Sequence, residues 1–383
     1  MKKLIILSAI SIIMFTSCSI ETEISPSESI PDSFQMQTES QFTPDKQNGY
    51  TPLNFTNQVG LWLPYMDFEN YMYNQSESEY RENIKKILAD AKAEDINTIY
   101  FHVHPNGDSY YKSEKFPKGT YYTGDYDPLQ IMLDEAHNMG ISVHAWINPL
   151  RLQTVEQMQN LSDDFIVKQW INENSPKVKI VNNRWYLNPA YDDVIQLVSE
   201  SAREIINNYD VDGVQIDDYF YPTTDTDFDI EAFESSDSSD LSQWRQDNIS
   251  KMVKSLHDTV KNSDRHLKFG VSPQGNINAN YNTQYADVNL WAGTEGYADY
   301  IIPQIYYGFE NETCPFEPTL KAWENLTNDN ISLIIGLAEY KTGEEDKWAG
   351  EAGKNEWIDN PDIIQQQIEL VKDSSADGYA LYR

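Results

Sequence analysis

Short apolar runs alternate along most of the chain with longer polar stretches of helical period. Eight of these runs are typical of buried strands and cover residues 59–63, 97–104, 141–147, 211–216, 268–272, 300–306, 333–338 and 378–382. Amphipathic patterns between them predict helices, for example over residues 79–92, 192–209 and 244–260. Strands that alternate with helices pair in parallel, so eight such units predict an α/β fold, a closed (β/α)8 barrel, as one domain over residues 59–383.

An open, doubly wound sheet is the alternative arrangement for the same pattern. No glycine-rich phosphate loop follows the first predicted strand, which weakens that alternative. The sequence stops at Arg383, on the eighth predicted strand. We therefore expect the last helix of the barrel to be missing from this sequence, or the sequence to be truncated.

The amino terminus has the pattern of a targeting signal. Two lysines precede the apolar segment Leu4–Phe15, which is too short to span a bilayer as a transmembrane helix, the alternative reading. Small residues then precede Cys18, as in a bacterial lipoprotein signal that is cleaved before a lipid-bearing cysteine. Residues 19–58 are rich in Ser, Thr, Glu and Pro and predict a flexible linker. We expect a protein outside the cytoplasm, anchored to a bacterial cell membrane through Cys18.

Charge and cysteine content limit the partners. The formal net charge is −33, with 61 acidic and 28 basic side chains, which excludes nucleic acid as a ligand because a phosphate backbone needs a basic face. If Cys18 carries lipid, Cys314 has no disulfide partner, and no histidine near it in sequence would activate it as a catalytic thiol. No cofactor is predicted, and we expect a monomer.

The most informative segment is the apolar run 211–216, which ends in two adjacent carboxylates. Charged side chains are seldom buried without partners, so Asp217 and Asp218 at the end of a buried strand call for an explanation. In a parallel α/β protein the carboxyl ends of the strands carry the catalytic groups. The alternative is that the two aspartates cap the next helix.

Four motifs in order carry a resemblance to a known family. They are His144–Arg151, Asp212–Pro222, Phe269–Pro273 and Ile302–Tyr306. The chain resembles the glycosyl-hydrolase-like family 10 of secreted or lipid-anchored bacterial proteins. The resemblance implies a (β/α)8 fold and the cleavage of glycans, including peptidoglycan strands stripped of their peptides. His104 departs from the arginine expected at its position in that family.

The carboxylates predict how a glycan would be cleaved. Adjacent aspartates are poorly placed to flank a sugar from opposite faces, as most glycosidases require. They suit a substrate-assisted route, in which one orients the N-acetyl group of the substrate and the other protonates the leaving oxygen. Glu339, after the seventh predicted strand, is a competing nucleophile or else a loop carboxylate. Asp67 and Asp108 read as turn residues, and Asp299 lies at the opposite, structural end of its strand.

Polar and aromatic side chains near the other strand ends are candidates for substrate binding. Arg151 could clamp a carboxylate or a sugar hydroxyl, or pair with an aspartate structurally. Tyrosine and tryptophan can stack on sugar rings, although Tyr221 and Trp291 could equally be packing residues. The full set is His104, Trp146, Asn148, Arg151, Tyr219, Tyr221, Trp291, Gln304 and Tyr306.

Two rival functions remain open. His102, His104 and His144 could bind zinc with Asp217, but no histidine follows on the fifth or sixth predicted strand, so no metal site is predicted. The acidic run 225–229 lacks the glycine and glutamate of a calcium loop. A glycan-binding lipoprotein without turnover is the main rival to a glycoside hydrolase, because a barrel alone does not guarantee catalysis.

Overall fold

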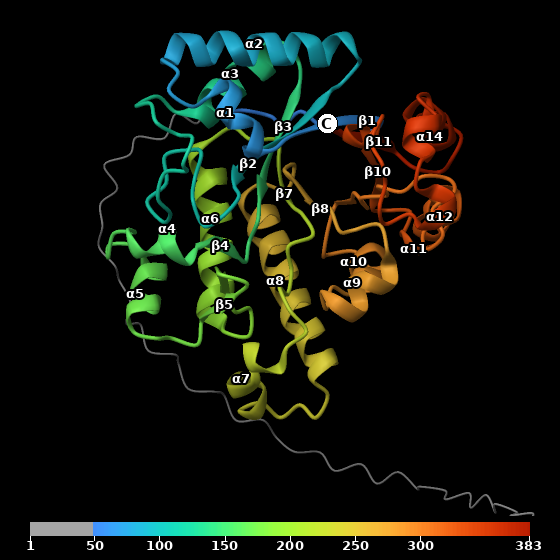
Figure 1. Ribbon diagram of the computed structural model, residues 1–383. Helices are drawn as coiled ribbons and strands as arrows, with labels where there is room; N and C mark the ends of the chain where they lie inside the picture. The colour runs from blue at the N-terminus through green and yellow to red at the C-terminus, as the bar shows by residue number, and fades with distance from the viewer. Residues whose placement is uncertain (1–48) are drawn as a thin grey trace, which may run out of the picture. The chain divides into compact units, whose positions relative to one another are not determined.

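The fold is a closed barrel of eight parallel strands. A computed structural model describes residues 49–383, and all barrel and helix statements refer to that part of the chain. Around the barrel the strand order is β1-β11-β10-β9-β8-β7-β3-β2, with β1 closing the ring on β11, so that the C-terminus lies beside β1 (Figure 1). The strands are β1 (Gln58–Leu63), β2 (Thr98–His104), β3 (Ser142–Ile147), β7 (Gly213–Ile216), β8 (Lys268–Val271), β9 (Tyr300–Ile301), β10 (Ser332–Ala338) and β11 (Gly378–Tyr382).

The predicted (β/α)8 class is confirmed, and each of the eight predicted strands is present. Pairing of β1 with both β2 and β11 excludes the open sheet. The sixth strand is much shorter than predicted, because Pro303 has no N–H to donate to a ladder. Beyond β9 the pairing continues only through Gln304, which forms single bridges to Gln274 and Gly336.

Helices follow seven of the barrel strands. The longer ones are α2 (Glu77–Ala93), α3 (Pro128–Asn138), α6 (Asp192–Asn208), α8 (Leu241–Ser263), α11 (Phe316–Leu326) and α14 (Ile363–Lys372). The short ones are α1 (Phe68–Tyr71), α4 (Val155–Gln159), α5 (Ile166–Asn172), α7 (Ile230–Glu234), α9 (Ile277–Thr283), α10 (Val288–Gly293), α12 (Gly350–Gly353) and α13 (Glu356–Asp359). Single 3-10 turns are η1 (Tyr65–Asp67), η2 (Thr226–Phe228) and η3 (Glu339–Lys341).

Local sequence explains where the main helices begin. Ser76 and Glu79 form a capping box at the start of α2, so each side chain satisfies a backbone N–H of the other residue. Asp127 caps α3, which begins at Pro128, where a missing N–H costs nothing. In α6 the buried residues recur with helical spacing, and this face packs inward while Asp192 and other polar residues face solvent.

A small antiparallel sheet is inserted between β3 and α6 and was not predicted. Its order is β4-β6-β5, with β4 (Arg151–Thr154), β5 (Val178–Val181) and β6 (Arg184–Leu187). Asn182 and Asn183 form the two-residue turn between β5 and β6, both with positive φ, as a tight hairpin requires. Figure 1 shows α4 and α5 beside this sheet. The insertion brings Arg151 and Arg184 into one sheet.

Aromatic rings fill the inside of the barrel and pack against glycines of neighbouring strands. The rings of Trp62, Tyr100, Trp146 and Tyr300 belong to one buried cluster. A Cβ added to the facing glycines would collide with these rings or with His144. The added Cβ would lie 2.6 Å from the ring of Tyr100 at Gly60, 2.7 Å from that of His144 at Gly213, 1.9 Å from that of Tyr300 at Gly270 and 3.1 Å from that of Trp62 at Gly336.

Gly270→Ala should therefore lower the free energy of unfolding by about 3 kcal/mol, because overpacking forces the ring of Tyr300 and the backbone apart. Guanidinium unfolding monitored by circular dichroism would measure the change. Gly293→Ala is the matched control, since its nearest non-local atom lies 3.8 Å from the new Cβ, and it should change stability by less than about 1 kcal/mol. Equal effects of the two substitutions would contradict the packing argument.

At the amino-terminal end of the barrel, four polar side chains tie the strands together in pairs. Each precedes a strand and accepts the backbone N–H of the second residue of the preceding barrel strand. The pairs are Asn97 with Val59 (3.0 Å), Asp212 with Val143 (2.7 Å), Asp299 with Phe269 (2.8 Å) and Asp377 with Leu333 (3.0 Å). Asp299 also binds Lys261. The structural position predicted for Asp299 agrees with these contacts.

Asp212 also holds the segment that leads into the barrel. Its carboxylate accepts from Tyr50 Oη at 2.5 Å and from the N–H of Leu53 at 2.6 Å, and it lies 3.0 Å from His137 Nε2. The side chain of Asp212 is fully buried. Residues 50–57, which we predicted to be the end of a flexible linker, thus contact the barrel, so the folded part begins before residue 59.

Asp212→Ala should lower the free energy of unfolding by about 3 kcal/mol or more, because it leaves several buried donors without an acceptor. Asp192→Ala removes a carboxylate from an exposed ion pair with Lys251 and should cost less than about 0.5 kcal/mol. Chemical unfolding of both variants would test this. A loss at Asp212 as small as that at Asp192 would contradict the role assigned to this network.

No helix among residues 49–383 is both long and apolar enough to cross a membrane. The predicted lipid-bearing residue Cys18 lies outside the described residues, as does the predicted signal segment 1–18.

Candidate active site

Asp217 and Asp218 lie side by side in sequence at the carboxyl end of the barrel, directly after β7. Asp217 is buried, with 3% of its surface exposed, whereas Asp218 is partly exposed and Tyr219 is exposed. The N–H of Tyr219 approaches Asp217 Oδ1 at 3.4 Å, a long contact for a hydrogen bond. Both carboxyl groups lie at the mouth of the barrel, where hydrogen bonds from Gln304 and Gln284 act on Asp218.

Burial raises the pKa of both carboxyl groups. For Asp217 the pKa lies well above its usual value, first because of burial and then because of the negative charge of Asp218; contacts with Tyr219 and Trp146 and the charge of Arg151 offset part of the rise. Burial likewise raises the pKa of Asp218, against the effects of Gln304, Gln284 and Arg151. Two interacting carboxyl groups titrate as a pair, so one proton can remain on them above the pH at which an ordinary aspartic acid loses it.

Arg151, the first residue of β4, provides the positive charge that acts on both carboxyl groups of this pair. Its guanidinium carbon lies 4.4 Å from the ring centre of Tyr219. Its Nε is buried without a hydrogen-bond partner, and no ion pair to a carboxylate is present for Arg151 within residues 49–383. The structural pairing with an aspartate, one of the two roles considered for Arg151, is not formed.

Trp146 and Asn148 form the base of the site on the β3 side. The indole N–H of Trp146 donates to Asn148 Oδ1 at 3.1 Å, and Asn148 Nδ2 donates to the carbonyl of Pro105 at 3.0 Å. The ring of His102 stacks on Trp146 with centres 3.5 Å apart and planes within 10°. Asn148 is therefore fully used in fixing the loop and the indole, and Trp146 is covered on one face by His102.

Three tyrosines, Tyr306, Tyr340 and Tyr382, pack together on the opposite side, where β9, β10 and β11 end. Tyr306 stacks on Tyr382 with ring centres 6.0 Å apart, and Tyr340 meets Tyr382 edge-on at 5.6 Å. Burial raises the pKa of Tyr306, and the negative charges of Asp217 and Asp218 add to the rise. These tyrosines therefore lie within electrostatic range of the carboxyl pair. Gln304 Nε2 donates to the carbonyl of Ser272 at 3.0 Å and is held facing Asp218.

Three predicted site residues are not brought to the carboxyl pair. Trp291 is completely buried and donates its indole N–H to Ser250, so it presents no face to a ligand. Tyr221 packs within the loop after β7 and beneath the guanidinium of Arg245. Glu339 accepts from Arg383 Nε at 2.8 Å. Of the two roles predicted for Trp291 and Tyr221, sugar stacking or packing, the structure shows packing.

The histidines of the barrel do not gather around a metal position. His104 packs edge-on against Phe116 at 4.2 Å, and His144 Nδ1 lies 2.6 Å from Tyr300 Oη, lower in the barrel. Burial lowers the pKa of His104 to about 3 and that of His144 to about 4, and the pKa of His102 is also well below its usual value. All three are neutral at pH 7. Among residues 49–383, no three His, Cys, Asp or Glu side chains are arranged to hold a metal ion.

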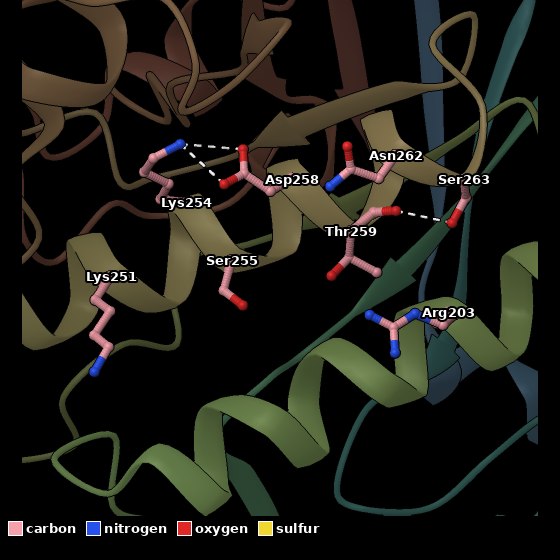
Figure 2. Close-up of a pocket in the computed structure, with 8 residues that line it drawn as sticks. All are labelled: Arg203, Lys251, Lys254, Ser255, Asp258, Thr259, Asn262 and Ser263. Carbon is pink, nitrogen blue, oxygen red and sulfur yellow. Dashed lines mark hydrogen bonds and ion pairs between the residues drawn. The ribbon is translucent and has the colours of Figure 1, made fainter. Parts of the chain in front are cut away.

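A separate hollow lies outside the barrel, on the surface of α6 and α8. It has a volume of about 460 Å³, and Figure 2 shows its lining side chains. Lys254 and Asp258 form an ion pair there, and Lys251 pairs with Asp192. The lining residues are Arg203, Lys251, Lys254, Ser255, Asp258, Thr259, Asn262 and Ser263. None of the predicted site residues lines this hollow.

The structure adds residues that sequence reasoning did not assign to the site. Tyr382 ends β11 and could have been found, since the carboxyl ends of all eight strands converge. His102 was considered only as a metal ligand. Tyr65 meets His102 edge-on at 5.5 Å from the turn after β1. Arg184 lies on the unpredicted sheet, and no local signal marked it.

The fold defines the class of protein, a closed (β/α)8 barrel. Residues 58–351 match the model of the family Glycosyl hydrolase-like 10, and the chain belongs to that family. The family resemblance noted in the sequence is thus confirmed.

Relatives and solved structures agree on the fold. The chain is similar to Glycosyl hydrolase YngK of Bacillus subtilis (29% identity over 78% of this chain and 63% of the relative) and to Glycosyl hydrolase DigH of Escherichia coli K12 (30% identity over 72% and 69%). It thus spans less than two thirds of the length of the Bacillus relative. The PgaB (BpsB) glycoside hydrolase domain of Bordetella bronchiseptica superimposes with a TM-score of 0.57 over 85% of this chain and 94% of that domain, at 12% identity.

Arg151→Gln should raise the apparent pKa values of the carboxyl pair, because the guanidinium charge favours the ionised forms. Carbon-13 NMR titration of labelled aspartate carboxyls would measure the shift. Arg203→Gln, on the outer surface of α6, is the control and should leave both titrations unchanged. A shift toward lower pH in Arg151→Gln would show that the charge does not act on this pair.

Proposed function

We propose that the chain is a glycoside hydrolase that cleaves N-acetylated bacterial cell-wall glycan strands of the peptidoglycan type. The observation that carries the proposal is the adjacent pair of buried Asp217 and partly exposed Asp218, whose pKa values are both raised, at the mouth of an aromatic-lined barrel. Raised pKa values in an adjacent pair favour a protonated carboxyl group beside an ionised one, and an acid and a base are what the hydrolysis of a glycosidic bond requires.

Membership of the Glycosyl hydrolase-like 10 family and relatives named as glycosyl hydrolases support the reaction class. The N-acetylated substrate is inferred from the aspartates themselves. Adjacent residues of one strand end cannot approach a sugar from both faces, so a nucleophile from the substrate is needed. The acetamido oxygen of an N-acetylated sugar can supply it.

In the proposed reaction, the acetamido carbonyl oxygen attacks the anomeric carbon while the glycosidic C–O bond breaks. The protonated member of the aspartate pair gives its proton to the leaving oxygen. The ionised member accepts the amide N–H and stabilises the positive charge of the cyclic intermediate. Water then attacks the anomeric carbon and gives a proton back to the carboxylate that lost one. The bond between the anomeric carbon and the acetamido oxygen breaks in this step, its electron pair returns to the acetamido group, and the net reaction consumes one water.

Tyr219 and Tyr306 are the aromatic side chains that we expect to contact sugar rings around the pair. Tyr219 is 39% exposed, and its ring is oriented by Arg151. Tyrosines combine an apolar face with a hydroxyl, which suits a pyranose. We also propose that Cys18 carries a lipid anchor that holds this domain at a bacterial membrane.

Asp217→Asn and Asp218→Asn should each lower kcat by about 100-fold or more, because each removes a proton-transferring or charge-stabilising group. Mass spectrometry of products from peptide-free peptidoglycan strands would measure this. Wild-type protein should release shortened N-acetylated oligosaccharides. Strands stripped of their N-acetyl groups should remain intact in all reactions.

Glu339→Gln is the discriminating control. If the substrate supplies the nucleophile, this variant should keep activity within about 10-fold, since Glu339 pairs with Arg383. A loss as large as that of the aspartate variants would make Glu339 the nucleophile and reject the substrate-assisted route. Intact strands that still bind to the wild-type protein would favour a glycan-binding lipoprotein without turnover.

A further inference from the structure

Two arginines of the inserted sheet interact electrostatically with each other, one of them, Arg151, also acts on the carboxyl pair, and neither forms an ion pair with a carboxylate within residues 49–383. Arg151 opens β4, and Arg184 opens β6, its partner in the inserted sheet. Each guanidinium lies within electrostatic range of the other: burial lowers the pKa of Arg184, and the charge of Arg151 lowers it further. Like charges that repel each other at a half-buried site require a counter-charge.

Most of the N–H donors of these two side chains are free. Arg184 uses only Nη1, which donates to the carbonyl of Leu152 at 2.5 Å and to Asn106 Oδ1 at 3.0 Å. Arg151 makes no side-chain hydrogen bond within the described residues, and its Nε is shielded from water. A buried donor without an acceptor is costly, so an acceptor from outside the chain is expected here.

The nearby acidic groups do not supply that acceptor. Asp217 and Asp218 interact electrostatically with Arg151 but form no ion pair with it among residues 49–383. Asp108 acts on Arg184 in the same way, while its carboxylate is bound to the N–H of Asn106. Within the described residues, Arg151 and Arg184 thus have no acidic side chain as an ion-pair partner, although the chain carries a net charge of −33.

We propose that Arg151 and Arg184 form a subsite for a carboxylate carried by a sugar next to the cleaved bond, so that the substrate is an acidic glycan. A guanidinium fork matches a planar carboxylate with two parallel hydrogen bonds. The ring of Tyr219 under Arg151 fixes the plane of one fork. This inference rests on the proposed function for its substrate, but the subsite is defined by binding rather than by turnover.

Equilibrium binding to the full chain tests the subsite without catalysis. Three N-acetylated probes would be compared by calorimetry. Peptide-free peptidoglycan strands carry a lactyl carboxylate, hyaluronan oligosaccharides carry a uronic carboxylate, and chitin oligosaccharides carry none. The Asp217→Asn background would keep the strands intact during the measurement. We expect at least one acidic probe to bind about 10- to 100-fold more tightly than the neutral one.

Arg151→Gln and Arg184→Gln should remove this preference by lowering affinity for the acidic probe and leaving the neutral probe unchanged. Arg151→Lys should recover only part of it, because an ammonium cannot form the fork. Arg203→Gln is the control and should behave as the parent protein. Arg151 makes no ion pair that stabilises the fold, so Arg151→Gln remains informative even if the Arg184 variant unfolds.

The results separate this subsite from the hydrolytic function. Equal affinity for acidic and neutral probes, no binding of either acidic probe, or equal losses for all probes in the arginine variants would each overturn the subsite. Arginine-dependent binding of an acidic glycan that the wild-type protein leaves uncut would uphold the subsite and reject the proposed hydrolysis. The acidic probe that binds more tightly identifies the source of the carboxylate.

Discussion

The packing of aromatic rings on glycines inside the barrel is the constraint on which the rest of the structure depends. Where the ring of Tyr300 faces Gly270, even one added carbon would lie 1.9 Å from a ring atom. The rings fill the interior up to Trp62 and Trp146, and Trp62 donates to Gln215 at 3.1 Å just below the mouth. Asp217 follows this packed interior, and its burial is the main cause of its raised pKa.

One buried aspartate lies directly before strand β7 and another directly after it, and the two differ in the hydrogen bonds that they accept. Asp212 accepts two backbone N–H groups and the hydroxyl of Tyr50, all at 2.7 Å or less. Asp217 has one backbone donor at 3.4 Å. Several short hydrogen bonds hold the Asp212 carboxylate in place, whereas a single long backbone contact reaches Asp217. The same residue type thus has a structural role at Asp212 and, in the proposed function, a chemical role at Asp217.

Sequence alone could predict the barrel because each strand is a compact apolar run and the helices between them have local caps. It could also predict that Asp217, Arg151, Gln304 and Tyr306 lie near one another at the mouth of the barrel, since the carboxyl ends of parallel strands meet at one face. It could not distinguish the aromatic side chains that line the mouth of the barrel from those that pack in the core. Trp291 is turned inward by a bond to Ser250, a contact across the fold that leaves no local pattern. The inserted sheet was missed because its four-residue, half-exposed strands show no clear alternation.

The missed insertion changes how the charge of the chain is understood. From composition alone, −33 argues against an acidic substrate, since like charges repel. That repulsion is screened beyond about 8 Å at physiological salt, so the groups at the mouth decide which ligand is accepted. There burial raises the pKa of both carboxyl groups, and the inserted sheet adds the guanidinium groups of Arg151 and Arg184. The local balance is therefore opposite to the global one, and an acidic chain can present a basic rim to its ligand.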